Sequence, residues 1–158
     1  MDSQLTVFAD RFTKLHERSL AFVTSLTDAQ LFADPRSKPN SMTMFSCGEY
    51  ILRSAAAVEQ TFGGITTRLW DDPFEWTLPE KLSTTALVVD YLNEVDATMR
   101  HGFAFFKSDA DLIKQLPAPE RIRSIFDLLL DTLGRAEHYQ GRAFAVFQML
   151  SDAKLPRI

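Results

Sequence analysis

Four stretches of the chain place apolar residues three or four positions apart, the spacing that gathers them on one face of an α-helix. We therefore predict helices near 1–26, 41–62, 82–106 and 121–151. The longest pattern is in the fourth stretch, whose apolar or small residues are Ile125, Leu129, Leu133, Ala136, Ala143, Phe147 and Leu150. Since each helix has one apolar face to bury and no long strand-like alternation occurs, the sequence predicts an all-α four-helix bundle.

Capping residues and helix breakers suggest where these helices begin and end. Thr27 and Gln30 have the spacing of a capping box, which predicts a short helical turn after the first helix. Ser41 and Ser83 are the expected N-caps of the second and third helices. The glycine pair at 63–64 is expected to end the second helix, because glycine adopts the left-handed backbone of a C-terminal cap with little strain.

Two segments between the helices have no helical pattern. Segment 66–79 carries Trp70, Phe74 and Trp76 among prolines and acids, so we expect it to fold back onto the bundle. Its rings are expected to cover a bundle end or a dimer surface, and a lid over a ligand pocket is the alternative. Segment 107–120 contains two prolines and is expected to be a connection.

Composition narrows the class of protein. The 158 residues, 46% of them hydrophobic, are expected to form a single domain spanning 1–158. A net charge of −4 argues against nucleic acid as a partner. No apolar run has the length needed to span a bilayer, and the polar start lacks a signal peptide's apolar core, so we expect a cytoplasmic protein without a membrane partner. The single cysteine, Cys47, is expected to be a small buried apolar residue.

The fourth helical stretch contains, at 138–142, the sequence His-Tyr-Gln-Gly-Arg, followed by a hydrophobic run and then Leu155 and Pro156. This sequence resembles the last helix of the DinB/YfiT-like superfamily of metalloenzyme folds. The resemblance implies a four-helix bundle, frequent dimers and a divalent metal such as nickel or zinc. In that family two histidines of a His-x-x-x-His-x-Gly-Gln motif bind the metal, together with a histidine of the second helix.

Alignment of this motif on Gly141 puts Arg135 and Tyr139 at the two histidine positions and Arg142 at the glutamine position. Neither Arg135 nor Tyr139 is a good metal ligand near neutral pH, because arginine stays protonated and tyrosine deprotonates only at high pH.

The histidine position of the second helix can be matched in two ways. One alignment places it at Gly48 and the other at Arg53. Gly48 is on the apolar stripe and Arg53 is opposite it, so we prefer Gly48. A glycine inside a helix costs about 1 kcal/mol relative to alanine, which indicates close packing or a pocket at that point.

The three histidines of the chain are the fallback ligand set for a metal. At about 100° per residue, His138 lies roughly 160° from the apolar stripe of its helix, His101 about 120° and His16 about 60°. No two are spaced three or four residues apart, and no Glu-x-x-His motif occurs. We therefore expect no bound metal or other cofactor.

The replaced positions leave two interpretations open, a small bound anion and an ion pair within the helix. Arginine offers five donors in a fixed geometry and no acceptor, so Arg135 with Tyr139 can hold a carboxylate or a phosphate. Arg135 can instead pair with Asp131, one turn earlier. The candidate ligand-binding residues are Gly48, Arg53, Arg135, Tyr139 and Arg142.

Two functions follow from these observations. The preferred one is a ligand-binding or interaction module that has lost the three-histidine metal site. The alternative is a metal-dependent enzyme with a displaced site, similar to the thiol-dependent transferases and isomerases of the superfamily. The sequence does not decide whether the protein is an enzyme.

The chain has 13 phenylalanines, more than four apolar stripes need. Several apolar residues lie at or beyond the stripe edges, namely Phe103, Phe105, Leu130, Phe144 and Val146. A homodimer would bury them.

Overall fold

Four long helices form the body of the protein in a computed structural model that describes residues 3–35, 44–76 and 79–157. They are α1 (Gln4–Thr24), α3 (Cys47–Thr67), α5 (Thr85–Phe103) and α6 (Ile125–Leu150). The shorter elements are the helical turns α2 (Asp28–Leu31) and α4 (Pro73–Trp76), the 3-10 turns Pro79–Leu82 and Asp109–Asp111, and the strands β1 (Gln115–Pro117) and β2 (Ile122–Ser124).

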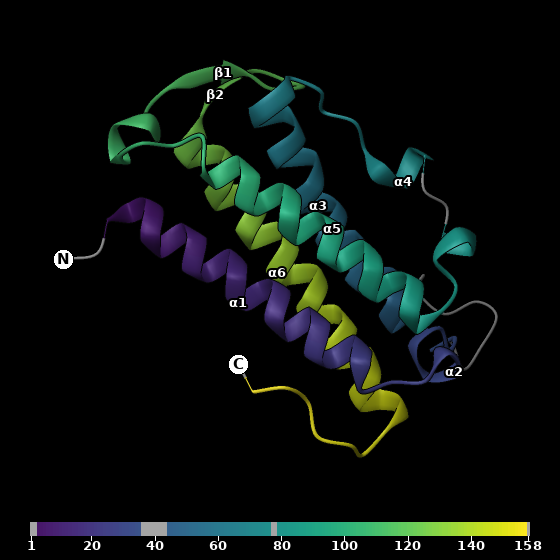
Figure 1. The fold of residues 1–158 in the computed structure, drawn as a ribbon. Coiled ribbons are helices and arrows are strands. Elements are labelled where there is room, and N and C mark those ends of the chain that lie inside the picture. The colour runs from purple at the N-terminus through teal and green to yellow at the C-terminus, as the bar shows by residue number, and fades with distance from the viewer. Residues whose placement is uncertain (1–2, 36–43, 77–78, 158) are drawn as a thin grey trace.

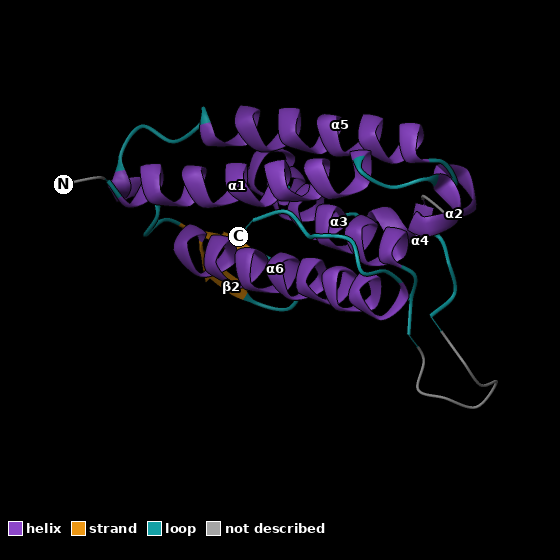
Figure 2. Ribbon diagram, turned by 90° about the horizontal axis from the view of Figure 1, so that it is seen from below, coloured by secondary structure: helices purple, strands orange, loops and turns teal. Residues whose placement is uncertain are grey.

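The long helices lie side by side (Figure 1), and a view from below shows the same arrangement (Figure 2). Helix α3 packs against α6 and α5, and α1 packs against α5 and α6. The predicted all-α four-helix bundle is confirmed. Within the described ranges, no helix is long and apolar enough to cross a lipid bilayer.

Each long helix begins after a serine or threonine whose side-chain oxygen accepts an amide N–H from the first turn, as expected for an N-cap. These caps are Ser3, Ser46, Thr84 and Ser124. The capping box predicted at Thr27 and Gln30 is confirmed and begins α2.

The second long helix starts later than predicted. Ser41 lies outside the described residues, and 44–46 are not helical, so the start predicted near 41 is wrong. Helix α3 starts at Cys47 because Ser46 and Glu49 form a capping box, in which the Ser46 N–H donates to the Glu49 carboxylate at 2.9 Å.

The second long helix also ends later than predicted. It continues through Gly63 and Gly64 to Thr67, and Arg68, with φ of 64°, takes the left-handed position. Gly64 has a packing role instead, because a Cβ there would overlap the indole ring of Trp70.

The third and fourth helices are shorter than predicted. Helix α5 begins after Thr84, not Ser83, and ends at Phe103. Helix α6 begins at Ile125, because 122–124 pair as a strand with 115–117. The predicted connection 107–120 therefore includes half of a two-stranded antiparallel hairpin, which covers one end of the bundle (Figure 1).

The described part of the segment 66–79, which ends at residue 76, folds back on the bundle, as predicted. Trp70 covers the bundle end at the hairpin, where its Nε1–H donates to the Pro117 carbonyl at 3.1 Å. Phe74 is half-buried and packs against the core. The side chain of Trp76 lies outside the described residues.

The apolar residues assigned to a dimer surface have different surroundings. Phe144 and Val146 are buried within the chain, and Phe103 packs in a cluster of aromatic rings, so for these three the assignment is wrong. Phe103 and Phe144 contact aromatic rings of neighbouring helices, so the buried face extends beyond a single stripe. Phe105 and Leu130 are exposed by 54% and 53%, so they remain available to a partner.

Candidate functional site

A pocket of about 80 Å³ lies between α3, α6 and the segment 71–76, which contains α4 and is called the α4 segment below. It brings together three of the predicted site residues. The residues around it are Arg53, Ala56, Ala57 and Gln60 from α3, Arg135 and Tyr139 from α6, and Asp72 and Phe74 from the α4 segment. Positions 53 and 60 are seven apart and 135 and 139 are four apart, so each pair shares one helix face. The two alanines leave open the space between the longer side chains.

Arg53 is held between two aromatic rings. Its guanidinium carbon lies 4.1 Å from the centroid of the Phe45 ring and 4.6 Å from that of Phe74, within the range of cation–π interactions. Its Nε is buried and has no hydrogen-bond partner among the residues the structure describes. The aromatic rings thus fix a positive charge beside the pocket without neutralising it.

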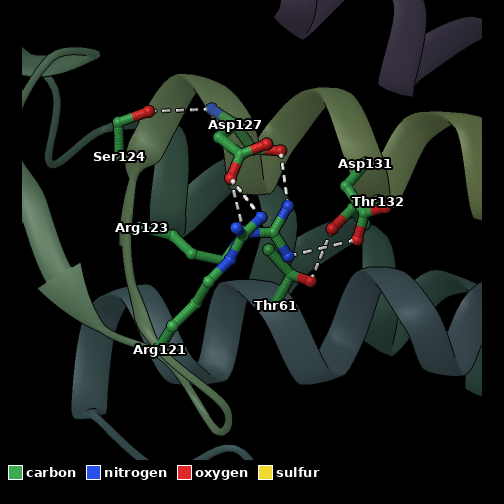
Figure 3. Close-up of polar contacts among 7 residues, drawn as sticks. All are labelled: Thr61, Arg121, Arg123, Ser124, Asp127, Asp131 and Thr132. Atoms are coloured by element: carbon green, nitrogen blue, oxygen red, sulfur yellow. Dashed lines mark hydrogen bonds and ion pairs between the residues drawn. The ribbon is translucent and has the colours of Figure 1, made fainter.

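Arg135 is exposed and has no hydrogen bond or ion pair within the described parts of the chain. The alternative pairing with Asp131 is not formed. Asp131 Oδ2 accepts instead from Arg123 Nη1 at 3.4 Å, and Arg123 Nε donates to Asp127 at 2.6 Å. Figure 3 shows the side chains of Arg123, in β2, and of Arg121, just before β2, extending toward Asp127. The hydrogen bond from Arg123 lowers the pKa of Asp127.

Tyr139 and the nearby acid complete the pocket. The Tyr139 ring stacks on the Tyr50 ring, with 6.5 Å between their centroids. Asp72 accepts the Phe74 N–H at 2.9 Å, so part of its charge stabilises its own turn. Two arginines and one aspartate leave the pocket with a formal charge of one positive unit (2 − 1 = +1).

A larger groove of about 380 Å³ opens beside the pocket. Gln60 and Arg135 border both spaces, so the pocket and the groove are direct neighbours. The groove runs past Trp70 and the hairpin turn over the first turns of α6. At its floor the hydroxyls of Thr61 and Thr132 hydrogen-bond each other at 2.6 Å, joining α3 to α6 (Figure 3).

The other candidate residues lie elsewhere. Gly48 does not line the pocket, and it packs closely as expected, since a Cβ there would lie 2.5 Å from Cε1 of Phe32. Arg142 is exposed, and its Nη1 donates to the Tyr50 hydroxyl at 3.4 Å. The two alignments of the second helix placed the histidine position at Gly48 or at Arg53. Of these two residues, only Arg53 borders the same pocket as Arg135 and Tyr139.

The three histidines lie on three different helices. His138 and His101 are exposed, on α6 and α5, whereas His16 of α1 is half-buried beside a void of about 20 Å³. In the part of the chain that the structure describes, no group of three or more histidines, cysteines, aspartates or glutamates could hold a metal ion.

Sequence reasoning missed several pocket residues. Gln60 shares a helix face with Arg53, so the spacing could have identified it once Arg53 was chosen. Asp72 lies outside the long helices, where no periodicity predicts its position. Phe74 was expected only as part of a possible lid, and it does border the pocket.

Comparison with known proteins establishes the fold. The crystal structure of a DinB-like protein from Bacillus cereus ATCC 10987 matches this structure with a TM-score of 0.74, over 96% of this chain and 95% of that chain. The chain has a DinB-like fold. The two sequences are 15% identical, so the likeness concerns the fold alone. No protein-family model matches the sequence, and no curated protein matches it significantly.

The residues at the positions implied for the metal of a DinB-like fold do not fit a divalent cation. Arg53 and Arg135 present only N–H donors and permanent positive charge. The Nε of Arg53 is buried and has no hydrogen-bond partner among the described residues, and an N–H donor cannot coordinate a metal ion.

Proposed function

We propose that this DinB-like protein is a binding module without a metal, and that it holds a small carboxylate or phosphate in the pocket of Arg53, Arg135, Gln60 and Tyr139. The observation that supports it most is that two guanidinium groups border one pocket while neither has an anionic partner among the described residues. Arg53 is half-buried as well as unpaired, and a partly dehydrated cation favours an incoming anion.

The two arginines suit different parts of this task. Arg53 is restrained by Phe45 and Phe74, so an anion that binds it does not have to order a free side chain. Arg135 is exposed and can close over the anion from the solvent side. With one net positive charge in an open site, we expect a dissociation constant between about 1 µM and 1 mM.

Calorimetric titration with inorganic phosphate and with acetate, at low ionic strength, tests this proposal. Arg53→Gln and Arg135→Gln should each weaken phosphate binding at least tenfold, since each removes a charged donor. Arg100→Gln is the matched control, because Arg100 is exposed on α5 and pairs with Asp96 away from the pocket. Absence of binding by either anion at 10 mM, or equal affinity in the Arg53→Gln variant, would overturn the proposal.

Metal analysis tests the absence of a metal separately. Protein purified without added metal should contain substoichiometric nickel and zinc, and titrated zinc should bind no more tightly than to a surface histidine. Stoichiometric metal of micromolar affinity, lost on replacing His138 or His16, would favour the alternative of a metal-dependent enzyme with a displaced site.

A further inference from the structure

The groove beside the anion pocket indicates what the anion is attached to. Gln60 and Arg135 border both spaces, so the groove is the neighbouring space toward which the body of a ligand held in the pocket would extend. The groove's volume of about 380 Å³ is within the range of about 300–1,000 Å³ typical of small-molecule sites. The pocket alone accommodates only a small anionic group.

The groove presents both acceptors and donors. Glu120 and Asp131 contribute carboxylates, and Arg121 contributes an exposed guanidinium. Asp131 uses one oxygen for Arg123, and its other oxygen has no hydrogen bond from any described residue. A hydroxyl group can donate to such a carboxylate and accept from an arginine, so it satisfies both kinds of neighbour.

Other ligand bodies fit this groove less well. A second anionic group would face Glu120 and Asp131, and Arg121 offers it little compensation because its guanidinium already pairs with Asp127 at 3.7 Å. An apolar body would remove water from these charged groups without replacing their hydrogen bonds. Arg123 does not offset this, because Asp127 and Asp131 already occupy its guanidinium (Figure 3).

We infer that the ligand is an organic monophosphate with a neutral hydroxylated body, of the sugar-phosphate class. Its phosphate binds Arg53 and Arg135, and its hydroxyl groups lie in the groove against Asp131 and Glu120. This inference rests on the proposed anion site and adds the groove to it.

The test compares inorganic phosphate with glucose 6-phosphate, ribose 5-phosphate and glycerol 3-phosphate, and with free glucose. At least one organic phosphate should bind ten times more tightly than inorganic phosphate, whereas glucose should not bind at 10 mM. Ala118→Trp fills the groove without touching the pocket, because Ala118 borders the groove alone. This variant should lower the affinity for the organic phosphate to the affinity for inorganic phosphate. The affinity for inorganic phosphate itself should stay unchanged.

Two further variants make the result specific. Asp131→Asn removes a charged acceptor from the groove. It should weaken binding of the organic phosphate but not binding of inorganic phosphate. Ala104→Trp, at an exposed position after α5 that borders neither space, should change neither affinity.

The outcomes separate this inference from the proposal beneath it. If inorganic phosphate binds through Arg53 and no organic phosphate binds more tightly, the inference is overturned and the anion site stands. If an organic phosphate binds tightly but Ala118→Trp has no effect, its body lies elsewhere and the inference is again overturned. If phosphate does not bind at all, the anion site itself fails.

Discussion

Replacing Gly102 with alanine should destabilise the protein, although alanine is the better helix former. Gly102 is buried within α5, and a Cβ there would overlap Cδ1 of Phe62 and lie 3.2 and 3.3 Å from two more ring atoms. Phe62 is fully buried and its ring contacts Phe12 and Phe103, with centroids 5.5 and 5.1 Å apart. The ring therefore cannot move away without disturbing its neighbours.

The magnitude follows from two opposing effects. Alanine gains about 1 kcal/mol over glycine inside a helix. Overpacking a filled core costs about 1–3 kcal/mol, and the upper part of that range applies because the overlap involves Cδ1 of a buried ring that its neighbours hold in place. The net change is a loss of about 1–2 kcal/mol, which for this chain length lowers Tm by about 2–8 °C.

Gly134→Ala is the matched control. Gly134 is exposed on α6 and a Cβ there would have no neighbour within 4 Å, so alanine should stabilise by about 0.4–1 kcal/mol. Thermal and urea unfolding, followed by far-ultraviolet circular dichroism, measures both variants. A Gly102→Ala protein as stable as Gly134→Ala would refute the packing argument.

Three further predictions concern a thiol, a carboxylate and the oligomer. Burial raises the pKa of Cys47 to about 11, so a disulfide reagent at pH 8 should label native protein far more slowly than protein in urea; equal rates would contradict this. Hydrogen bonds, first from Lys114 and then from two backbone N–H groups, lower the pKa of Asp111 to about 2. Its ionised form therefore stabilises the fold above about pH 4 and this contribution is lost toward pH 2, so Asp111→Asn should lower Tm at pH 7 and differ less from the wild type as pH falls. An unchanged difference at pH 2 would exclude this linkage. Light scattering should give twice the 17.9 kDa mass of one chain, and Leu130→Glu should reduce the measured mass to that of a single chain because Leu130 is exposed. A monomeric wild type would remove the case for a homodimer.

The spacing of apolar residues was sufficient to predict the four long helices, because each apolar stripe extends over several turns. It was insufficient for the hairpin, since strands of three residues are too short to show alternation. The glycines at 63–64 were misread because glycine serves both helix ends and close contacts, and only the position of Trp70 distinguishes the two roles.

The site was partly predictable for a similar reason. Arg135 and Tyr139 are one turn apart, so the motif alone places them together. The choice between Gly48 and Arg53 depended on whether the site faces the core, and the sequence contains no information about that. The pocket lies on the outer side of α3, where Arg53 is only half-buried and the α4 segment supplies the remaining wall.

The fold can keep its stability while the chemistry of this pocket changes, because different residues determine the two. Arg53, Arg135 and Tyr139 are not among the buried core residues, which come from the apolar stripes. Removing Arg135 should therefore disturb folding little, and removing Arg53 should cost about the 1 kcal/mol of its contacts with Phe45 and Phe74. Loss of phosphate binding in these variants would thus report on the anion site rather than on unfolding.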